Sequence, residues 1–240
     1  MNILLSNDDG YKSLGLMTLK ERLNQYGKVF TVAPYKDISA SSSCLSVHNP
    51  VKVQLISKTF YKVYGTPADC VHIATRGLMS KYPDIVFSGV NFGSNMGDDV
   101  IYSGTVGAAI EGRHAKFGSY SISIASKKPR YIDEIQDNIG HVVDYIFLEL
   151  VKYKSIFNIN IPDIPFSKIK GFKITKLGTR NISKRAKIIK NDETYFNIGE
   201  VGKGNLSAKS DFDAINKDYI SVTPINIDMT DFNLFHKMKK

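Results

Sequence analysis

The sequence contains no tryptophan and only two cysteines. Cys44 and Cys70 do not form a CxxC pair, so we expect free thiols and no disulfide framework. No apolar run approaches the length of about 20 residues that a membrane-spanning helix needs. The apolar run at the amino terminus reaches Asp8 before a signal-type hydrophobic region forms. These absences predict a cytoplasmic protein with no membrane partner.

Acidic residues are outnumbered by lysine and arginine, 23 to 32, which gives a formal net charge of +9. A positive surface suits an anionic partner such as a phosphate-bearing metabolite. The basic residues are scattered rather than gathered into one patch, so we expect no specific nucleic-acid partner. The length of 240 residues and the hydrophobic share of 42% fit one large globular domain, or one domain with an extension.

Strand and helix patterns alternate over the first two thirds of the chain. A buried strand from residue 2, a helix over 13–23 with one apolar face and a strand over 29–33 predict a βαβ unit with a parallel sheet. Further strands are expected at 51–55, 60–64, 84–90, 120–125 and 157–162. Further helices are expected at 66–78, 103–111 and 132–153. This order predicts an α/β fold, a mostly parallel sheet flanked by helices.

The pattern changes after Pro162 and becomes β-rich and basic, with strands expected at 170–175, 195–198 and 218–224 and a short tail from Met229. We therefore divide the chain into a core, residues 1–162, and a β-rich carboxyl-terminal extension, residues 163–240, within one structural unit. The extension is expected to pack on, or exchange with, a neighbouring subunit.

The first strand ends in two adjacent carboxylates, Asp8 and Asp9, followed by Gly10. Neighbouring side chains of a strand point to opposite faces, so both can serve one site only if the chain turns, and Gly10 permits that turn. Two like charges repel unless a cation or a row of donors lies between them, and a divalent metal is the simplest solution. A plain Asp-Asp-Gly turn is an equal alternative on these residues alone.

Other oxygen-bearing side chains fall at the carboxyl ends of predicted strands, where an open parallel sheet binds its ligands. Ser39 follows the second strand, Asn91 follows the strand at 84–90, and small residues open the helix at 103–105, where backbone N–H groups can approach an anion. The five histidines lack metal-ligand spacing. Hard oxygen donors suit Mg²⁺ or Mn²⁺ rather than zinc or copper.

Each of these features also has a purely structural reading. Ser39 is one serine among several in a polar loop, and Asn91, Asn95 and the nearby glycines fit a turn. Asp98 and Asp99 are expected to cap or fix their loop rather than bind metal. If the oxygen donors do meet, they can hold a metal, and a phosphate can bridge this metal and the start of the helix. Hydrolysis of the phosphate ester then follows, with an aspartate taking a proton from water. Attack by Asp8 itself is a less favoured variant.

At this point the motifs resemble those of the SurE family of survival nucleotidases, and the resemblance covers nearly the full length. The matching segments are Asn7-Asp8-Asp9-Gly10, the serine loop at 39–43, Gly65-Thr66-Pro67-Ala68-Asp69-Cys70-Val71, Ser88-Gly89-Val90-Asn91, Gly93, Asn95, Gly97-Asp98-Asp99, Tyr102-Ser103-Gly104-Thr105-Val106, Glu111-Gly112-Arg113, Asn158-Ile159-Asn160-Ile161-Pro162, Asp211-Phe212 and 219–224.

The resemblance implies a Rossmann-like core and a metal-dependent phosphatase of nucleoside 5′- and 3′-monophosphates, with short polyphosphate as a further substrate. It implies one Mg²⁺ or Mn²⁺ per subunit, and a homodimer or homotetramer formed through exchanged carboxyl-terminal segments. The implied metal ligands are Asp8, Asp9, Ser39 and Asn91. The implied catalytic residues are Asp8, Asp9, Asn95 and Ser103. The implied substrate-binding residues are Ser39, Asn95, Ser103, Gly104 and Thr105.

Two departures from the family pattern affect the serine loop. Tyr35-Lys36-Asp37 stands where an Asp-Arg-Asn run is common, and Ala40-Ser41 replaces a common Gly-Ala. The chain after Thr223 is also short. Of the alternatives, a haloacid-dehalogenase phosphatase fails because its aspartates are separated by one residue, whereas Asp8 and Asp9 are adjacent. A non-catalytic nucleotide- or RNA-binding α/β module remains open.

Overall fold

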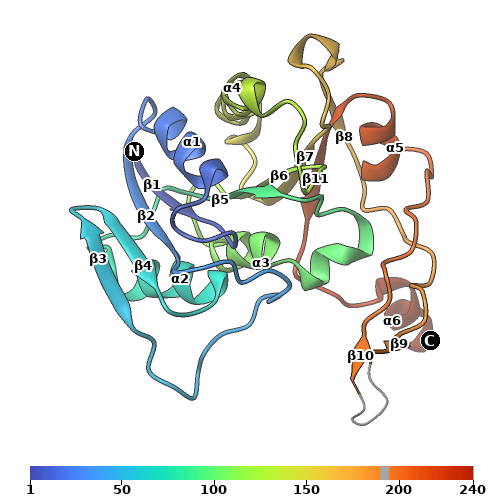
Figure 1. Cartoon of the computed structure of the whole chain (residues 1–240), viewed down its shortest axis with the longest axis horizontal. Coiled ribbons are helices and arrows are strands. Elements are labelled where there is room, and N and C mark those ends of the chain that lie inside the picture. Colours follow the sequence, from blue (N-terminus) through green and yellow to red (C-terminus); the bar gives the residue numbers. More distant parts are fainter. Residues whose placement is uncertain (190–194, 240) are drawn as a thin grey trace.

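A nine-stranded sheet forms the centre of the computed structural model, which describes residues 1–189 and 195–239 (Figure 1). Its strands are β1 (Asn2–Ser6), β2 (Lys28–Pro34), β3 (Val53–Ser57), β4 (Phe60–Val63), β5 (Ile85–Phe92), β6 (Ser119–Ile124), β7 (Ile156–Ile161), β8 (Phe172–Ile174) and β11 (Ile220–Ile225). A separate two-stranded ribbon joins β9 (Lys187–Ile188) to β10 (Phe196–Asn197). The helices are α1 (Leu14–Leu23), α2 (Pro67–Ile73), α3 (Gly104–Glu111), α4 (Ile135–Tyr145), α5 (Asp211–Asn216) and α6 (Phe232–Met238).

The strand order is β3-β4-β2-β1-β5-β6-β7-β11-β8. Pairing is parallel from β4 through β7 and between β11 and β8, and antiparallel at β3–β4 and at β7–β11. After β1, the chain forms β2, β3 and β4 on one side of β1. It then crosses to form β5 on the other side of β1. The strand order therefore reverses between β1 and β5, and a ligand crevice is expected beyond their carboxyl ends. The predicted fold class, a mostly parallel sheet flanked by helices, is confirmed.

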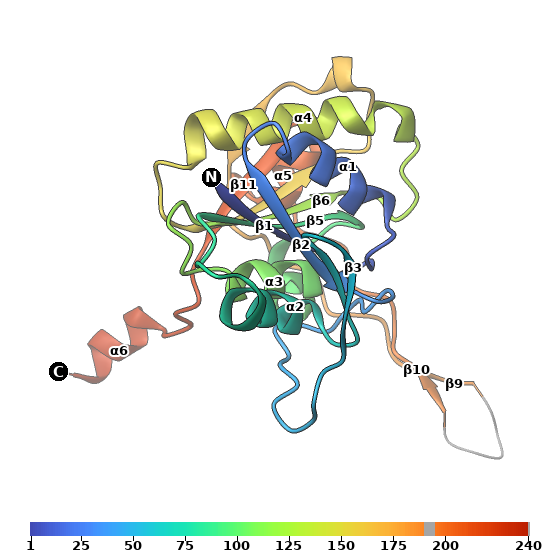
Figure 2. The same ribbon diagram turned by 90° about the vertical axis from the view of Figure 1, so that its left-hand side faces the viewer.

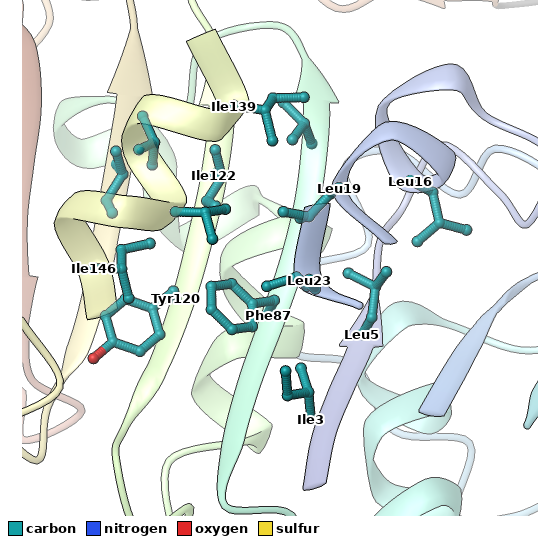
Figure 3. Packing of buried hydrophobic residues seen from close by; sticks show 14 of the residues in the cluster. Ile3, Leu5, Leu16, Leu19, Leu23, Phe87, Tyr120, Ile122, Ile139 and Ile146 are labelled. Carbon is teal, nitrogen blue, oxygen red and sulfur yellow. The ribbon is translucent and has the colours of Figure 1, made fainter. Parts of the chain in front are cut away.

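The two faces of the sheet are covered by different helices, with α1 and α4 on one side and α2 and α3 on the other (Figure 2). Strand β1 shows why: Ile3 and Leu5 pack under α1 and α4, whereas Leu4 lies in the cluster that includes α2 and α3. Figure 3 shows the first cluster, where Leu23 of α1 lies beside Phe87 of β5. Both faces of the central strands are buried, which explains their nearly continuous apolar sequence.

Helix starts follow local capping chemistry. Ser13 Oγ accepts a hydrogen bond from the backbone N–H of Leu16 at the start of α1. Before α2, Thr66 Oγ1 accepts from the N–H of Asp69, whose carboxylate accepts from the N–H of Thr66, a complete capping box.

Two predicted helices are less regular than expected. The expected helix over 66–78 changes from α2 to a π-helical turn at Ala74–Leu78. The expected helix over 132–153 is a 3₁₀ turn at Ile132–Glu134, then α4, then a π-helical turn at Ile146–Leu150. The apolar periodicity marks the buried face correctly, but it does not distinguish between hydrogen-bonding patterns that place side chains on nearly the same face.

The carboxyl-terminal part contributes both to the sheet and to segments outside it. Strands β8 and β11 extend the main sheet beyond β7, whereas the β9–β10 ribbon and α6 project from the body (Figure 2). Helices α5 and α6 were not predicted. Residues 190–194 and 240 of the predicted extension lie outside the described residues. Within 1–189 and 195–239, no helix has both the length and the apolar character needed to span a membrane.

Candidate active site

The turn after β1 brings the aspartate pair to the carboxyl edge of the sheet. Asn7 Nδ2 donates to the carbonyl oxygen of Gly10 at 3.0 Å and to Ser13 Oγ at 2.8 Å, which joins the turn to the cap of α1. Gly10 has a φ of +97°, a conformation that favours glycine. A Cβ at Gly10 would lie 2.9 Å from the backbone carbon of Lys36, so the turn also packs tightly against the loop after β2.

The two carboxylates have different environments. Asp8 is 4% exposed, and its Oδ1 accepts a hydrogen bond of 2.6 Å from the hydroxyl of Thr105 in α3. Asp9 is half-buried, and its Oδ2 accepts a longer bond of 3.3 Å from the backbone N–H of Phe92. The first carboxylate is thus held by a helix and the second by the end of β5.

Burial and mutual repulsion make this pair electrostatically unfavourable when both groups are charged. Burial raises the pKa of Asp8 to about 6, although the hydroxyl of Thr105 opposes the rise. Burial, followed by the charge of Asp8, raises the pKa of Asp9 to about 7. Among the described residues, no lysine or arginine forms an ion pair with either carboxylate. The pair therefore lacks a compensating cation from the part of the chain that the structure describes.

An irregularity in β5 determines where Asn91 lies. The register with β6 shifts between Gly89 and Asn91, so one extra residue is accommodated in β5. Phe87 and Val90 consequently pack in the same cluster although they are three residues apart, and Asn91 is turned to the opposite side. Asn91 Nδ2 donates to the carbonyl oxygen of Gly93 at 2.7 Å, which leaves the amide oxygen for a cation.

The serine loop after β2 adds a hydroxyl and a third carboxylate. Ser39 Oγ donates to Asp37 Oδ1 at 2.6 Å, and the backbone N–H of Ser39 donates to the same oxygen at 2.8 Å. The charge of Asp37 contributes to the raised pKa of both Asp8 and Asp9. The backbone N–H of Ile38 donates to the carbonyl oxygen of Asp8 at 2.9 Å, so this loop is attached to the aspartate turn.

Asn95 is the most extensively bonded residue of the site. Its Nδ2 donates to Ser123 Oγ at 2.8 Å and to Thr105 Oγ1 at 3.3 Å. From β7, Asn158 Nδ2 and Asn160 Nδ2 both donate to its carbonyl oxygen, at 2.7 and 2.9 Å, while Asn160 Oδ1 accepts from its N–H at 2.9 Å. Asn95 and Asp8 are thus connected through a single hydroxyl, that of Thr105.

Helix α3 begins at the same place. Ser103 is its N-cap and accepts a hydrogen bond of 3.1 Å from the N–H of Val106. Gly104 packs so closely that an added Cβ would lie 2.8 Å from Ser41 Oγ and 3.1 Å from the Cβ of Asp8. The amino-terminal end of this helix, which favours anions, therefore lies against Asp8.

A pocket of about 470 Å³ collects most of the predicted site residues. Asp8, Ser39, Asn91, Asn95 and Ser103 line it. Gly104 packs against Asp8, Thr105 bonds to Asp8, and Asp9 bonds to the backbone of Phe92 at the end of β5, but these three do not line the pocket. None of the five histidines lines it.

The donor set fits a hard divalent cation. No cluster of three or more His, Cys, Asp or Glu suited to a metal occurs in the part of the chain that the structure describes. The predicted set instead consists of two carboxylates, Asp8 and Asp9, with a hydroxyl from Ser39 and an amide oxygen from Asn91. Such oxygen-only sets are typical of Mg²⁺ and Mn²⁺, and the repulsion within the aspartate pair is relieved by a positive ion.

Several site residues were not predicted. Asp37, Asn158, Asn160, Lys127 and Arg180 either line the pocket or hold the residues that do. The repeated asparagines of Asn158-Ile159-Asn160-Ile161 were an available signal, since two amides on one face of a buried strand require partners. Asp98 and Asp99 fix their loop by bonding to Arg180, as expected.

Comparisons with known proteins find one family whose members are similar to this chain over most of its length. The family model described as "Survival protein SurE" matches residues 3–184. A "5'-nucleotidase SurE" of Vesicomyosocius okutanii is 43% identical over 97% of the chain and 94% of its own length. One of Haemophilus ducreyi is 44% identical over 96% of the chain and 95% of its own. The crystal structure of the SurE protein from Aquifex aeolicus superposes with a TM-score of 0.85 at 35% identity, covering 100% of the chain and 98% of that structure.

Proposed function

The chain belongs to the survival protein SurE family, and from this premise we propose that it is a 5′-nucleotidase, a hydrolase that releases phosphate from nucleoside 5′-monophosphates. One observation carries the assignment. The adjacent carboxylates of buried Asp8 and half-buried Asp9 have no cation from the described residues, and Asp8 meets the amino-terminal end of α3 at the point where the strand order reverses. The similarity to nucleotidases over the full length favours this function over a non-catalytic nucleotide-binding module.

Asp8, Asp9, Ser39 and Asn91 would hold one divalent cation, Mg²⁺ or Mn²⁺, per chain. When bound, such an ion supplies Lewis-acid polarisation of a phosphoryl group. Asp37 supports the proposal because it fixes the position of the Ser39 hydroxyl.

The chain's own residues would then position the phosphate and move the proton. Ser103 and Asn95 line the pocket beside Asp8, where their polar groups and the helix end can hold phosphate oxygens. An aspartate of the pair accepts the proton of the attacking water as the new oxygen–phosphorus bond forms. The ester bond breaks, and the nucleoside oxygen takes a proton from solvent. Thr105 keeps Asp8 in place through this sequence by its 2.6 Å hydrogen bond.

Two finer proposals follow from the same site and from the carboxyl-terminal segment. The residues around Asp8 are suited to a phosphate rather than to one end of a sugar, which supports 3′-monophosphates and short polyphosphate as further substrates.

Helix α6 exposes Phe232, Leu234 and Phe235, which are between 42% and 52% accessible. Such an apolar face supports exchange of residues 163–240 with a neighbouring subunit in a homodimer or homotetramer.

The assignment is tested by measuring phosphate released from AMP and GMP, with Mn²⁺ and again with excess chelator. We expect release with the metal and none with the chelator. Asp9→Asn should abolish release while leaving the far-ultraviolet circular dichroism spectrum unchanged. Release that persists in chelator, or in the variant, would contradict the proposed site.

A further inference from the structure

The pocket contains side chains that phosphate hydrolysis does not use. Besides its oxygen donors, the pocket is lined by Tyr102, the last residue of the 3₁₀ turn Gly97–Tyr102, and by Val201, which lies 99 positions further along the chain. Both side chains are 63% exposed. An aromatic ring and an aliphatic side chain open to solvent beside a phosphate site need an occupant with an apolar face.

Tyr102 presents its ring from a fixed backbone. The N–H of Ser42 donates to the carbonyl oxygen of Tyr102 at 3.0 Å, and Ser42 Oγ donates to the carbonyl oxygen of Ile101 at 2.6 Å. The next residue, Ser103, is the N-cap of α3. The ring is therefore exposed while its main chain is held between the serine loop and the phosphate-binding helix.

The segment that carries Val201 is also held in place. A Cβ on Gly202 would lie 1.8 Å from the carbonyl oxygen of Asn181, so the two backbones pack directly against each other. The N–H of Asn181 donates to the carbonyl oxygen of Lys203 at 3.0 Å. Val201 is thus attached to the strand-like segment that begins at Arg180.

Arg180 connects the two segments. Its backbone N–H donates to Asp98 Oδ1 at 3.1 Å and its Nε bonds to Asp99, both in the turn that ends at Tyr102. Its Nη1 donates to the carbonyl oxygen of Gly202 at 3.0 Å, next to Val201. The guanidinium also stacks over the ring of Phe212 at 4.8 Å. Its side chain is only 16% exposed, so Arg180 sets the separation of the two pocket walls.

We propose that Tyr102 and Val201 form a nucleobase cleft, in which the base of the substrate stacks on Tyr102 and is faced by Val201. This inference rests on the proposed nucleotidase function and adds the group that distinguishes a nucleotide from other phosphate esters. Arg180 is a positioning residue for the cleft. Arg180 and Asp99 already bond to each other, so their polar groups do not read the hydrogen-bonding edge of the base. The cleft therefore selects the base by stacking area.

The test compares AMP with ribose 5-phosphate, which carries the same phosphate and sugar but no base. We expect Tyr102→Ala to lower kcat/KM for AMP about 10- to 100-fold more than for ribose 5-phosphate, the range expected for one base–aromatic stack. Tyr102→Phe keeps the ring and should retain the preference for AMP. Arg180→Lys should lower the preference through a higher KM for AMP. The matched control is Tyr153→Ala, which removes a tyrosine of 56% exposure outside the pocket.

Adenosine tests binding of the base independently of hydrolysis, because it has no phosphate to hydrolyse. We expect saturation transfer by NMR from the wild-type protein to the adenine protons, and a loss of this transfer in Tyr102→Ala but not in Tyr153→Ala. If neither AMP nor ribose 5-phosphate is hydrolysed, the proposed function fails, while adenosine transfer that depends on Tyr102 still supports the cleft. An equal loss of activity on both substrates, or adenosine transfer unaffected by Tyr102→Ala, would overturn the cleft.

Discussion

Replacing Asp8 by asparagine should stabilise the metal-free protein. Burial raises the pKa of Asp8 from 3.8 to about 6, so the charged carboxylate opposes folding at neutral pH. At about 1.4 kcal/mol for each tenfold change in proton affinity, this rise corresponds to about 3 kcal/mol of unfolding free energy. Asparagine keeps an oxygen that can accept the Thr105 hydrogen bond, and the loss of charge also relieves Asp9. We expect a net gain of about 1 to 3 kcal/mol at pH 8.

The cost of charged Asp8 to the free energy of unfolding depends on pH. The folded protein binds the Asp8 proton more tightly than the unfolded chain, so the penalty is present in full above pH 6, is relieved as the pH falls through that value, and is absent below about pH 4. Urea denaturation in excess chelator at pH 8 and pH 4 measures the difference between Asp8→Asn and wild type. Asp133→Asn, which changes an exposed carboxylate, is the control. A variant that is equally destabilised at both pH values would refute the reasoning.

Two further predictions concern the contacts around Asp8. Thr105→Val removes the hydrogen-bond donor that lowers the pKa of Asp8. The acid limb of the pH–kcat/KM profile should therefore move to higher pH. An unmoved limb would show that this hydrogen bond does not affect the reacting group. Gly104→Ala introduces a Cβ at 2.8 Å from Ser41 Oγ and should lower kcat at least 10-fold. The control is Gly77→Ala, whose added Cβ meets nothing within 4 Å and should leave kcat unchanged. Equal kcat values in the two variants would contradict the close packing.

The proximity of the candidate site residues could be predicted from the sequence because of one geometric rule. Asp8 and Ser39 follow parallel strands and Asn91 lies near the end of one, and the carboxyl ends of such strands share an edge. The small residues at 103–105 were recognised as a helix start, and the structure confirms Ser103 as the N-cap. Local patterns were therefore sufficient for residues whose position depends on their own strand or helix.

The supporting contacts could not be predicted, because they join segments far apart in the chain. The bonds from Asn158 and Asn160 to Asn95 span 63 and 65 positions, and the bond between Arg180 and Asp99 spans 81. Nothing in the local pattern states which polar group a buried amide will meet. Helix α5 was missed for a different reason: it has only six residues, too few to show a helical period, although Ser210 caps it.

The most direct test of the central claim is a titration of the metal-free protein with Mn²⁺ by isothermal calorimetry. The arrangement of Asp8, Asp9, Ser39 and Asn91 predicts one ion per chain for the wild type and an affinity at least 10-fold weaker in Asp9→Asn, as expected when one of two carboxylate ligands is lost. Asp133→Asn should bind as the wild type does. No binding by the wild type, or equal binding by wild type and Asp9→Asn, would contradict the assignment of this pair as the metal site.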